Sequence, residues 1–516
     1  MKTLKIKRLK VLIAITLFVT ILSACGNEAT SVDNQNQPLI ILQGVDATSL
    51  DPAMHSDTPS SNVEYQIFDT LIKRSSDMHL KPSIANSWKM INDTTWKLTI
   101  RDDVKFHNGE TLTAEDVKFS IERIIDPKNK SPRMSHYNII KDVILEENNS
   151  IIIKTKQPYP VLLSRLSDLR IVPKKYLQEV GNEQFAVKPI GSGPYKLKEW
   201  QRDEFINLVA YEQYWDGCPE IKEVVFKPVP ESSARVMSLR AKEADIITNL
   251  PPHQVTELKQ SAGVDSVSVD STRVMFMSIT TNRKNVKDIR VRQALNYAID
   301  KQSIINNILE KSAVKSDQII SKFDLGFNNN LTEIDYNPQK AKQLLKDAGY
   351  EKGLKITMKS PSGRYLMDKE VAEAVKLQLE AVGIEVELTF EEFGTYVTKI
   401  ISGTMDADVW LIGWGSSTFD AGTTLKQWLY TPNKTAYYRV SKETNNHIDS
   451  LLEEALMTME EVRRAEIYYD IIQQVHNDSA FINLYQQKDL YGVSDRVKFS
   501  PRSDELIDVK SIKWKK

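Results

Sequence analysis

The sequence predicts an α/β fold, and three observations support this prediction. Strand and helix patterns alternate along the chain, and its second half repeats a strand-helix-strand order that is typical of a largely parallel sheet. The length of 516 residues corresponds to about three domains. The composition, with 41% hydrophobic and 27% charged residues, is that of a globular protein with a sizeable core.

The clearest elements of the first half are a strand and the helix that follows it. Residues 96–101 alternate in polarity, as a half-buried strand does, and turn signals follow at 102–103 and 107–109. Thr113 and Asp116 have the spacing of a capping box, so we expect a helix from Ala114 that ends at Asp126 before a proline.

The second half begins with one long amphipathic pattern over 289–305, for which we expect a single helix. Further on, Asn337 and Pro338 predict a helix start that Gly349 closes. Another helix is expected from Asp368, followed by a strand over 384–390 and a second strand over 407–413. Two segments could mark domain crossings: 188–194, which is rich in helix breakers, and the polar stretch 280–287.

The N-terminus predicts export. Five basic residues and no acid precede an apolar run over 11–22, which is about twelve residues long and too short to span a membrane, so residues 1–24 are expected to be a signal peptide. Residues 22–25 resemble the lipobox of bacterial lipoproteins, which implies a palmitate-bearing lipid on Cys25. A plain secretory signal with an incidental Cys25 is the alternative. The polar stretch 25–37 suits a flexible tether.

Charge and cysteine content exclude several classes of function. The net charge of −1 provides no positive field for nucleic acid, and removal of the basic leader leaves a mature chain near −6. Only Cys25 and Cys218 are present, so neither a disulfide framework nor a cysteine-based zinc site is possible, and Cys218 has no assigned role.

No pattern of catalytic or metal-ligating residues stands out. None of the seven histidines has a partner three or four residues away, and the Gly191-Ser192-Gly193 segment lacks the residues of a phosphate loop or a nucleophile elbow. We therefore expect no catalytic residue, metal or cofactor. An exported hydrolase that assembles scattered carboxylates is kept as a distant alternative.

Several segments in one order resemble the bacterial extracellular solute-binding proteins of family 5, which serve peptide and nickel ABC importers. These segments are 50–52 (LDP), 80–88 (LKPSIANSW), 104–109 (VKFHNG), 112–117 (LTAEDV), 191–195 (GSGPY) and 290–300 (RVRQALNYAID). The resemblance implies a two-lobed fold of the periplasmic-binding-protein type, with mixed sheets flanked by helices, an extra inserted domain and a ligand cleft between the lobes. The implied division is lobe I over 38–60, 189–283 and 480–516, the inserted domain over 61–188, and lobe II over 284–479.

The resemblance also implies a function. A protein of this kind is a monomeric, lipid-anchored receptor on the extracytoplasmic face of the cell membrane. It captures a small peptide and delivers it to the permease subunits and ATPases of an ABC importer.

The ligand is expected to be glutathione or a di- or oligopeptide. Peptide-binding members hold the ligand amine with an aspartate three residues after the tryptophan of a Gly-Trp pair, where this chain has Ser417, although Asp420 is nearby. Nickel-binding members have a histidine soon after that tryptophan. This chain has no histidine there, so a nickel chelate is only the alternative ligand. Segments 361–365, 368–372 and 413–421 are similar to the glutathione-import branch.

The candidate site follows from that similarity. Arg364 is the candidate carboxylate clamp, because a guanidinium binds a carboxylate in a bidentate manner. Ser416, Ser417 and Thr418 are candidate hydroxyl donors, Trp414 is a candidate apolar wall, and Asp420 a candidate amine partner. Thr48, Ser49 and Met275 are weaker candidates. A surface arginine, a Ser/Thr-rich turn and a core position for Met275 are the alternatives.

Overall fold

The computed structural model describes residues 37–515, and its central feature is one mixed sheet of eleven strands. The strand order is β15-β14-β16-β12-β17-β11-β1-β10-β9-β8, with β13 attached to β17. The strands are β1 Leu39–Gln43, β8 Tyr195–Gln201, β9 Phe205–Ala210, β10 Glu223–Pro228, β11 Ile246–Ile247, β12 Val264–Ile279, β13 Ala313–Lys315, β14 Leu354–Pro361, β15 Ile384–Glu391, β16 Val409–Gly415 and β17 Phe481–Ser494. The predicted signal peptide, the lipid site at Cys25 and the tether as far as residue 36 lie outside the described residues.

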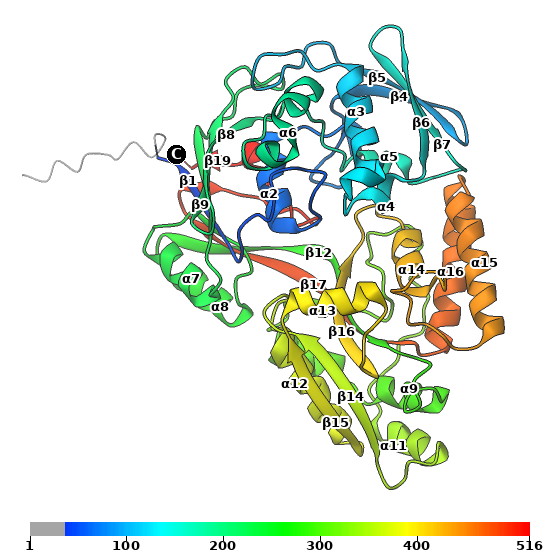
Figure 1. Cartoon of the computed structure of the whole chain (residues 1–516). Coiled ribbons are helices and arrows are strands. Elements are labelled where there is room, and N and C mark those ends of the chain that lie inside the picture. The colour runs from blue at the N-terminus through cyan, green and yellow to red at the C-terminus, as the bar shows by residue number, and fades with distance from the viewer. Residues whose placement is uncertain (1–36, 516) are drawn as a thin grey trace, which may run out of the picture. The chain divides into compact units, whose positions relative to one another are not determined.

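Strands β12 and β17 run through the middle of this sheet. The two strands lie side by side in Figure 1. They pair antiparallel over almost their whole length, from Val264 opposite Ser494 to Ser278 opposite Phe481. On one side β17 pairs with β11, and on the other β12 pairs with β16. The register shifts between Asp270 and Val274, so the intervening residues of β12 bulge out of the ladder. These two strands therefore join the halves of the sheet without an intervening loop.

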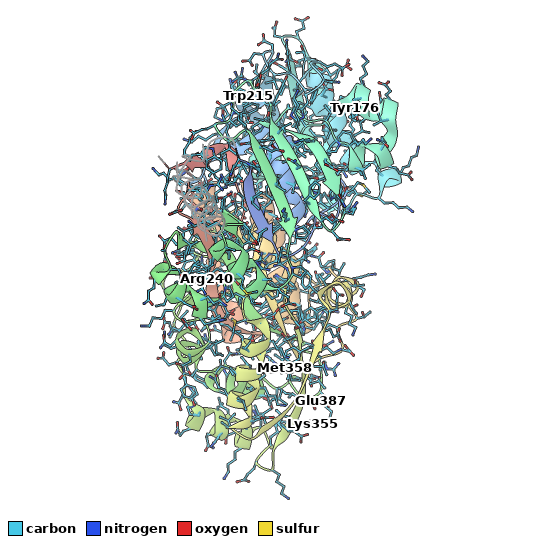
Figure 2. The ribbon with its side chains drawn as sticks, turned by 90° about the vertical axis from the view of Figure 1, so that its left-hand side faces the viewer. Tyr176, Trp215, Arg240, Lys355, Met358 and Glu387 are labelled. Atoms are coloured by element: carbon cyan, nitrogen blue, oxygen red, sulfur yellow. The ribbon has the colours of Figure 1, made fainter. Side chains whose placement is uncertain are left out.

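The second half of the chain confirms the predicted parallel arrangement. Strand β14 pairs parallel with both β15 and β16, and helices α12 and α13 supply the connections. Lys355 of β14 and Glu387 of β15 lie close together in Figure 2, with 3.6 Å between their charged atoms. The whole sheet is mixed, because β12, β17 and β9 run antiparallel to their neighbours. The helices of this half are α9 Ile289–Tyr297, α10 Lys301–Asn307, α11 Pro338–Asp347, α12 Asp368–Glu380, α13 Phe393–Ser402, α14 Ala421–Leu429, α15 Lys442–Met457 and α16 Glu461–Asn477.

The expected single helix over 289–305 is wrong. Helix α9 ends at Tyr297, and Asp300 caps a separate helix α10 by accepting a hydrogen bond from the backbone nitrogen of Ser303 at 2.9 Å. The apolar positions continue across the break because both helices pack on the same core, so hydrophobic periodicity alone did not reveal the cap. The polar stretch 280–287 is also packed, since Thr280, Thr281 and Val286 are buried.

A four-stranded sheet, ordered β4-β5-β7-β6, forms a separate layer with its own hydrophobic core. Strand β5 matches the predicted strand near 96–101, and helix α3 begins at the predicted Ala114 and ends at Ile125. The capping box is present, because the Asp116 carboxylate accepts a hydrogen bond from the backbone nitrogen of Thr113 at 2.9 Å. The elements here are β2 Ile72–Arg74, β3 Leu80–Pro82, β4 Ala85–Asn92, β5 Thr95–Ile100, β6 Ile140–Glu146, β7 Ser150–Thr155, α3 Ala114–Ile125, α4 Met134–Tyr137, α5 Leu162–Leu166 and α6 Lys174–Val187.

The remaining core lies around the N-terminal strands of the large sheet. Helices α2 (Thr58–Ile67), α7 (Ser232–Arg240) and α8 (Pro252–Gln260) contribute to it, and the chain ends beside it with β18 (Val497–Lys498) and β19 (Lys513–Trp514). The C-terminal half of the large sheet has a hydrophobic core of its own. Within residues 37–515, no helix is both long and apolar enough to cross a membrane.

The 191–193 segment joins the four-stranded layer to the large sheet. A Cβ atom on Gly191 would lie 2.0 Å from the backbone oxygen of Ile67, so no side chain fits there. The imidazole of His107 lies against this segment: its Nδ1 accepts a hydrogen bond from the backbone nitrogen of Gly191 at 3.3 Å, and its Nε2 donates to the backbone oxygen of Gly193 at 3.0 Å. These two partners require neutral His107 with the proton on Nε2.

This contact makes folding depend on pH. Burial lowers the pKa of His107 from its ordinary value of 6.5 to about 4, so the unfolded chain binds a proton that the folded chain does not. Stability from this group is therefore complete above pH 6.5 and is lost as the pH falls toward 4. We expect the free energy of unfolding in urea to be about 2 kcal/mol smaller at pH 5 than at pH 7 because of His107.

Substitution isolates this contribution. The variant His107→Gln should lose most of that difference between pH 7 and pH 5, whereas His79→Gln should keep it, since His79 is exposed. An unchanged pH dependence in His107→Gln would contradict the assignment.

Candidate ligand-binding site

The carboxyl ends of three parallel strands meet at one edge of the large sheet. Strand β14 ends at Pro361, β15 at Glu391 and β16 at Gly415. Open α/β sheets bind ligands outside the carboxyl ends of their strands. The loops that follow these strands carry Arg364, the start of helix α13 at Phe393, and residues 416–420. We call these loops, together with Arg273 and Glu505 beside them, the candidate ligand site.

Arg364 lies in a loop that one carboxylate holds in place. Asp368 accepts hydrogen bonds from the backbone nitrogens of Gly363 at 3.0 Å, Arg364 at 2.8 Å and Tyr365 at 3.0 Å. The half-buried Arg364 guanidinium lies 5.1 Å from the ring centre of Tyr365 and 5.4 Å from that of Phe393. In residues 37–515 it has no ion pair and no side-chain hydrogen bond.

The electrostatic environment of Arg364 favours an anion. Burial and the nearby Arg273 both lower the pKa of Arg364, because each disfavours its charged form. An anionic ligand group would relieve both effects by pairing with the guanidinium. Arg364 is therefore oriented by its own loop. The charges of Glu505 and Asp368 offset part of its positive charge, but it has no ion pair among residues 37–515.

Arg273 comes from the bulge of β12 and has a partner already. Its Nε and Nη2 atoms donate to Oε1 of Glu505 at 2.9 Å and 2.5 Å, and its Nη1 donates to the backbone oxygen of Gly413 at 3.3 Å. Burial would raise the pKa of Glu505, but Arg273 and Arg364 outweigh it and lower that pKa. Behind this pair, burial and the Glu505 charge raise the pKa of Asp489 to about 7. Strand β12 thus positions a charged pair beside Arg364.

Two of the hydroxyls in the 416–420 loop form local hydrogen bonds, and the third bonds a side chain from another part of the fold. Ser416 is buried, and its Oγ accepts from the backbone nitrogens of Thr418 at 3.3 Å and Phe419 at 3.1 Å. Thr418 is also buried, and its Oγ1 lies 2.6 Å from that of Thr423. Ser417 is exposed, and its Oγ accepts a hydrogen bond from Nη1 of Arg165 at 3.0 Å. Ser416 and Thr418 stabilise the loop, and Ser417 faces a residue from the four-stranded layer.

Asp420 is occupied by structural partners. It caps helix α14 by accepting from the backbone nitrogen of Gly422 at 3.0 Å, and it accepts from the hydroxyl of Tyr468 at 2.7 Å. Its other oxygen accepts from Nε of Arg464 at 2.9 Å, and both side chains are buried. Since these contacts use the whole carboxylate, the structure does not present Asp420 to a ligand amine.

The remaining predicted residues divide between the site and the core. Trp414 is half-buried at the end of β16, where its Nε1 donates to Thr424 at 3.2 Å. Met275 has no exposed surface, and its sulfur would lie only 2.5 Å from a Cβ atom on Gly413, as the core alternative predicts.

In the loop before α2, the hydroxyls of Thr48 and Ser49 form hydrogen bonds within the same segment. Thr48 donates to Asp57 at 2.7 Å, and the Ser49 oxygen accepts from the backbone nitrogen of Asp51 at 3.0 Å. Both hydroxyls therefore serve local contacts.

Sequence reasoning missed several residues of this site. Arg273, Glu505 and Arg165 come from three distant segments, and Phe393 begins a helix whose pattern gives no sign of a site. The spacing of residues along the chain shows no relation among them, because they come together only in the folded chain. The rule that ligands bind at the carboxyl ends of parallel strands was the one signal available for Phe393.

Strands β12 and β17 run from one core of the large sheet to the other, and the candidate ligand site lies at the edge of one of these cores. This arrangement defines a two-lobed solute-binding protein. The family model for bacterial extracellular solute-binding proteins, family 5, matches residues 79–436. The chain belongs to this family, whose members are solute-binding proteins of ABC transporters.

Similar proteins cover nearly the full chain. The glutathione-binding protein GsiB of Escherichia coli is 25% identical over 490 residues, which cover 92% of this chain and 93% of GsiB. The structure of the binding protein DppA from Helicobacter pylori, in complex with the peptide STSA, is 25% identical, has a TM-score of 0.81 and matches 93% of this chain and 98% of DppA. NikZ from Campylobacter jejuni, in complex with Ni(L-His), has the same fold, with 24% identity, a TM-score of 0.79 and coverage of 92% of this chain and 97% of NikZ.

Arg364 provides a direct test of the site. Loss of a charge-assisted pair with a ligand carboxylate costs about 1.5–3 kcal/mol, so Arg364→Ala should weaken binding of glutathione or alanyl-alanine about 10- to 100-fold. The empty protein should keep its melting temperature, because Arg364 has no ion pair to lose among the described residues. Isothermal titration and a thermal melt measure the two effects.

The matched control is Arg463→Ala, which removes an exposed arginine that pairs with Glu454 on a distant helix surface. It should change neither quantity. Equal affinity in Arg364→Ala and the parent protein would remove Arg364 from the site.

Proposed function

We propose that this protein is a lipid-anchored receptor that captures a small peptide outside the cell and delivers it to the permease of an ABC importer. Closure of two lobes over the ligand provides the affinity, and the protein carries out no chemistry itself. The permease subunits and their ATPases are its partners, and it acts as a monomer. Lobe I comprises 38–60, 189–283 and 480–516, the inserted domain 61–188, and lobe II 284–479.

One observation carries the peptide proposal: Arg364, a half-buried arginine at the carboxyl ends of the parallel strands, is flanked by two aromatic rings and has no ion pair among the described residues. Every peptide with a free C-terminus offers such an arginine a carboxylate. The matches to GsiB and to peptide-bound DppA over nine-tenths of the chain support the same ligand class. Glutathione is one candidate, and di- or oligopeptides are the others.

A nickel chelate is the second candidate ligand, and the fold similarity to NikZ is the observation that favours it. Within residues 37–515 no group of three His, Cys, Asp or Glu side chains could hold a metal ion. A chelate would therefore have to supply most of the metal ligands itself, while Arg364 bound a carboxylate of the chelator.

Calorimetry distinguishes these ligands. The mature chain should release or absorb heat with glutathione or with peptides of two to five residues, and the nickel–histidine complex should give none. Reduced and oxidised glutathione are titrated separately. Absence of binding by every peptide and by both forms of glutathione would refute the peptide proposal, and heat from the nickel complex alone would establish the second candidate.

The anchor is tested in the cell. Residues 22–25 end a short apolar leader with small residues and a cysteine, which is where a lipid would be attached. Growth on radiolabelled palmitate should label the protein, and Cys25→Ser should lose the label and release the protein from membranes. Cys218→Ser, which removes the other cysteine, should keep the label. Equal labelling of Cys25→Ser would show that Cys25 is not the lipid site.

A further inference from the structure

We propose that Arg165 and Ser417 form a second anion-binding subsite beside Arg364, so that the preferred ligands are small peptides with a second carboxylate. This inference rests on the proposed function and specifies its substrate class. It follows from the position, burial and missing partners of one arginine.

Arg165 is a buried cation. It belongs to helix α5 of the four-stranded layer, and only 8% of it is exposed. Within residues 37–515 its one side-chain hydrogen bond runs to Oγ of Ser417 at 3.0 Å, and its buried Nε has no partner there. No acid among residues 37–515 forms an ion pair with it. A buried charge without a counter-charge is unfavourable, so an incoming anion would be bound strongly there.

The groups around Arg165 do not neutralise it. Arg133 is also buried, but it pairs with Asp168. Burial, together with Arg165 and Arg133, lowers the pKa of His136 to about 3, which keeps this histidine neutral. Arg133 is a cation and His136 is neutral, so neither side chain provides Arg165 with a negative counter-charge.

A second arginine adds to the positive field at the same loop. The Arg74 guanidinium lies 4.3 Å from the ring centre of Phe419, and its buried Nη2 has no partner in the described part of the chain. Burial lowers the pKa of Arg74 to about 10, so it remains charged at neutral pH. Asp504, the acid whose charge acts on Arg74, already pairs with Arg502. The four-stranded layer thus presents two arginines to residues 417–419.

The two anion positions belong to neighbouring strands. Ser417 follows β16 and Arg364 follows β14, and these strands pair in parallel. The Ser417 oxygen accepts from Arg165, so its own proton can be donated to an anion. An ammonium group at this position would meet a guanidinium, which disfavours a free amine there. A peptide with two carboxylates could therefore contact Arg364 with one and Arg165 and Ser417 with the other.

Two matched peptides test this arrangement. Alanyl-glutamate and alanyl-glutamine have nearly the same shape and differ by one charge. The parent protein should bind alanyl-glutamate at least tenfold more tightly in titration calorimetry. Arg165→Gln should abolish this preference while leaving the affinity for alanyl-glutamine within about twofold, and Arg364→Gln should weaken both peptides. Equal affinities in the parent protein, or an intact preference in Arg165→Gln, would overturn the subsite.

A measurement without peptide separates this inference from the proposed function. In the empty protein Arg165→Gln should keep or raise the melting temperature, because it removes an uncompensated buried charge. Arg133→Gln, the matched control, should lower it, since it removes a partner of Asp168. A fall in Arg165→Gln as large as that in Arg133→Gln would show a structural role and overturn the subsite.

Glutarate, a simple dicarboxylate, completes the test. It should raise the melting temperature of the parent protein more than that of Arg165→Gln. If no peptide binds the parent protein, the proposed function fails, and this shift alone decides the subsite: its presence supports the subsite and its absence overturns it.

Discussion

The antiparallel pairing of β12 with β17 is the constraint on which the rest of the structure depends. These two strands carry hydrogen bonds from one core to the other. Near the middle the ladder shifts register twice, where Ser271 to Arg273 bulge out and again between Met275 and Phe276. A bulge frees side chains that a regular ladder would hold perpendicular to the sheet. Arg273 uses this freedom to reach Glu505 and the end of β16. The irregularity that interrupts the pairing therefore also supplies a charged pair to the candidate site.

Electrostatics at the candidate site follow from which arginines have partners. Arg273 and Arg464 are neutralised by Glu505 and Asp420, and they act as structural ions. Arg364 and Arg165 have no ion pair among the described residues, although both lose hydration on burial. In the empty protein no ion pair compensates for the free energy that this loss of hydration costs. An anionic ligand can compensate for it by pairing with the two guanidinium groups. Residues that bind a ligand are commonly those whose interactions the fold leaves incomplete.

Local signals predicted the elements with clear ends. The helix start at Pro338, the capping box at Thr113 and the strand-helix-strand order of the second half are all present, because each depends on residues close in sequence. The predicted helix over 289–305 was wrong, because the apolar period continued through the cap at Asp300. For the site, the sequence proposed Arg364, Trp414 and Asp420. Arg364 has no ion pair among the described residues, whereas the fold uses Asp420 to hold Arg464 and Tyr468.

By itself, then, the sequence determined the α/β class, the elements with clear end signals and the family, since these depend on periodicity, caps and motifs that are written along the chain. The tertiary structure alone decided which polar side chains are satisfied. That question depends on partners from segments hundreds of residues apart, such as Arg165 with Ser417 and Arg273 with Glu505. Serine, aspartate and arginine in one short segment look equally available in a sequence, and only folding shows which of them still lacks a partner.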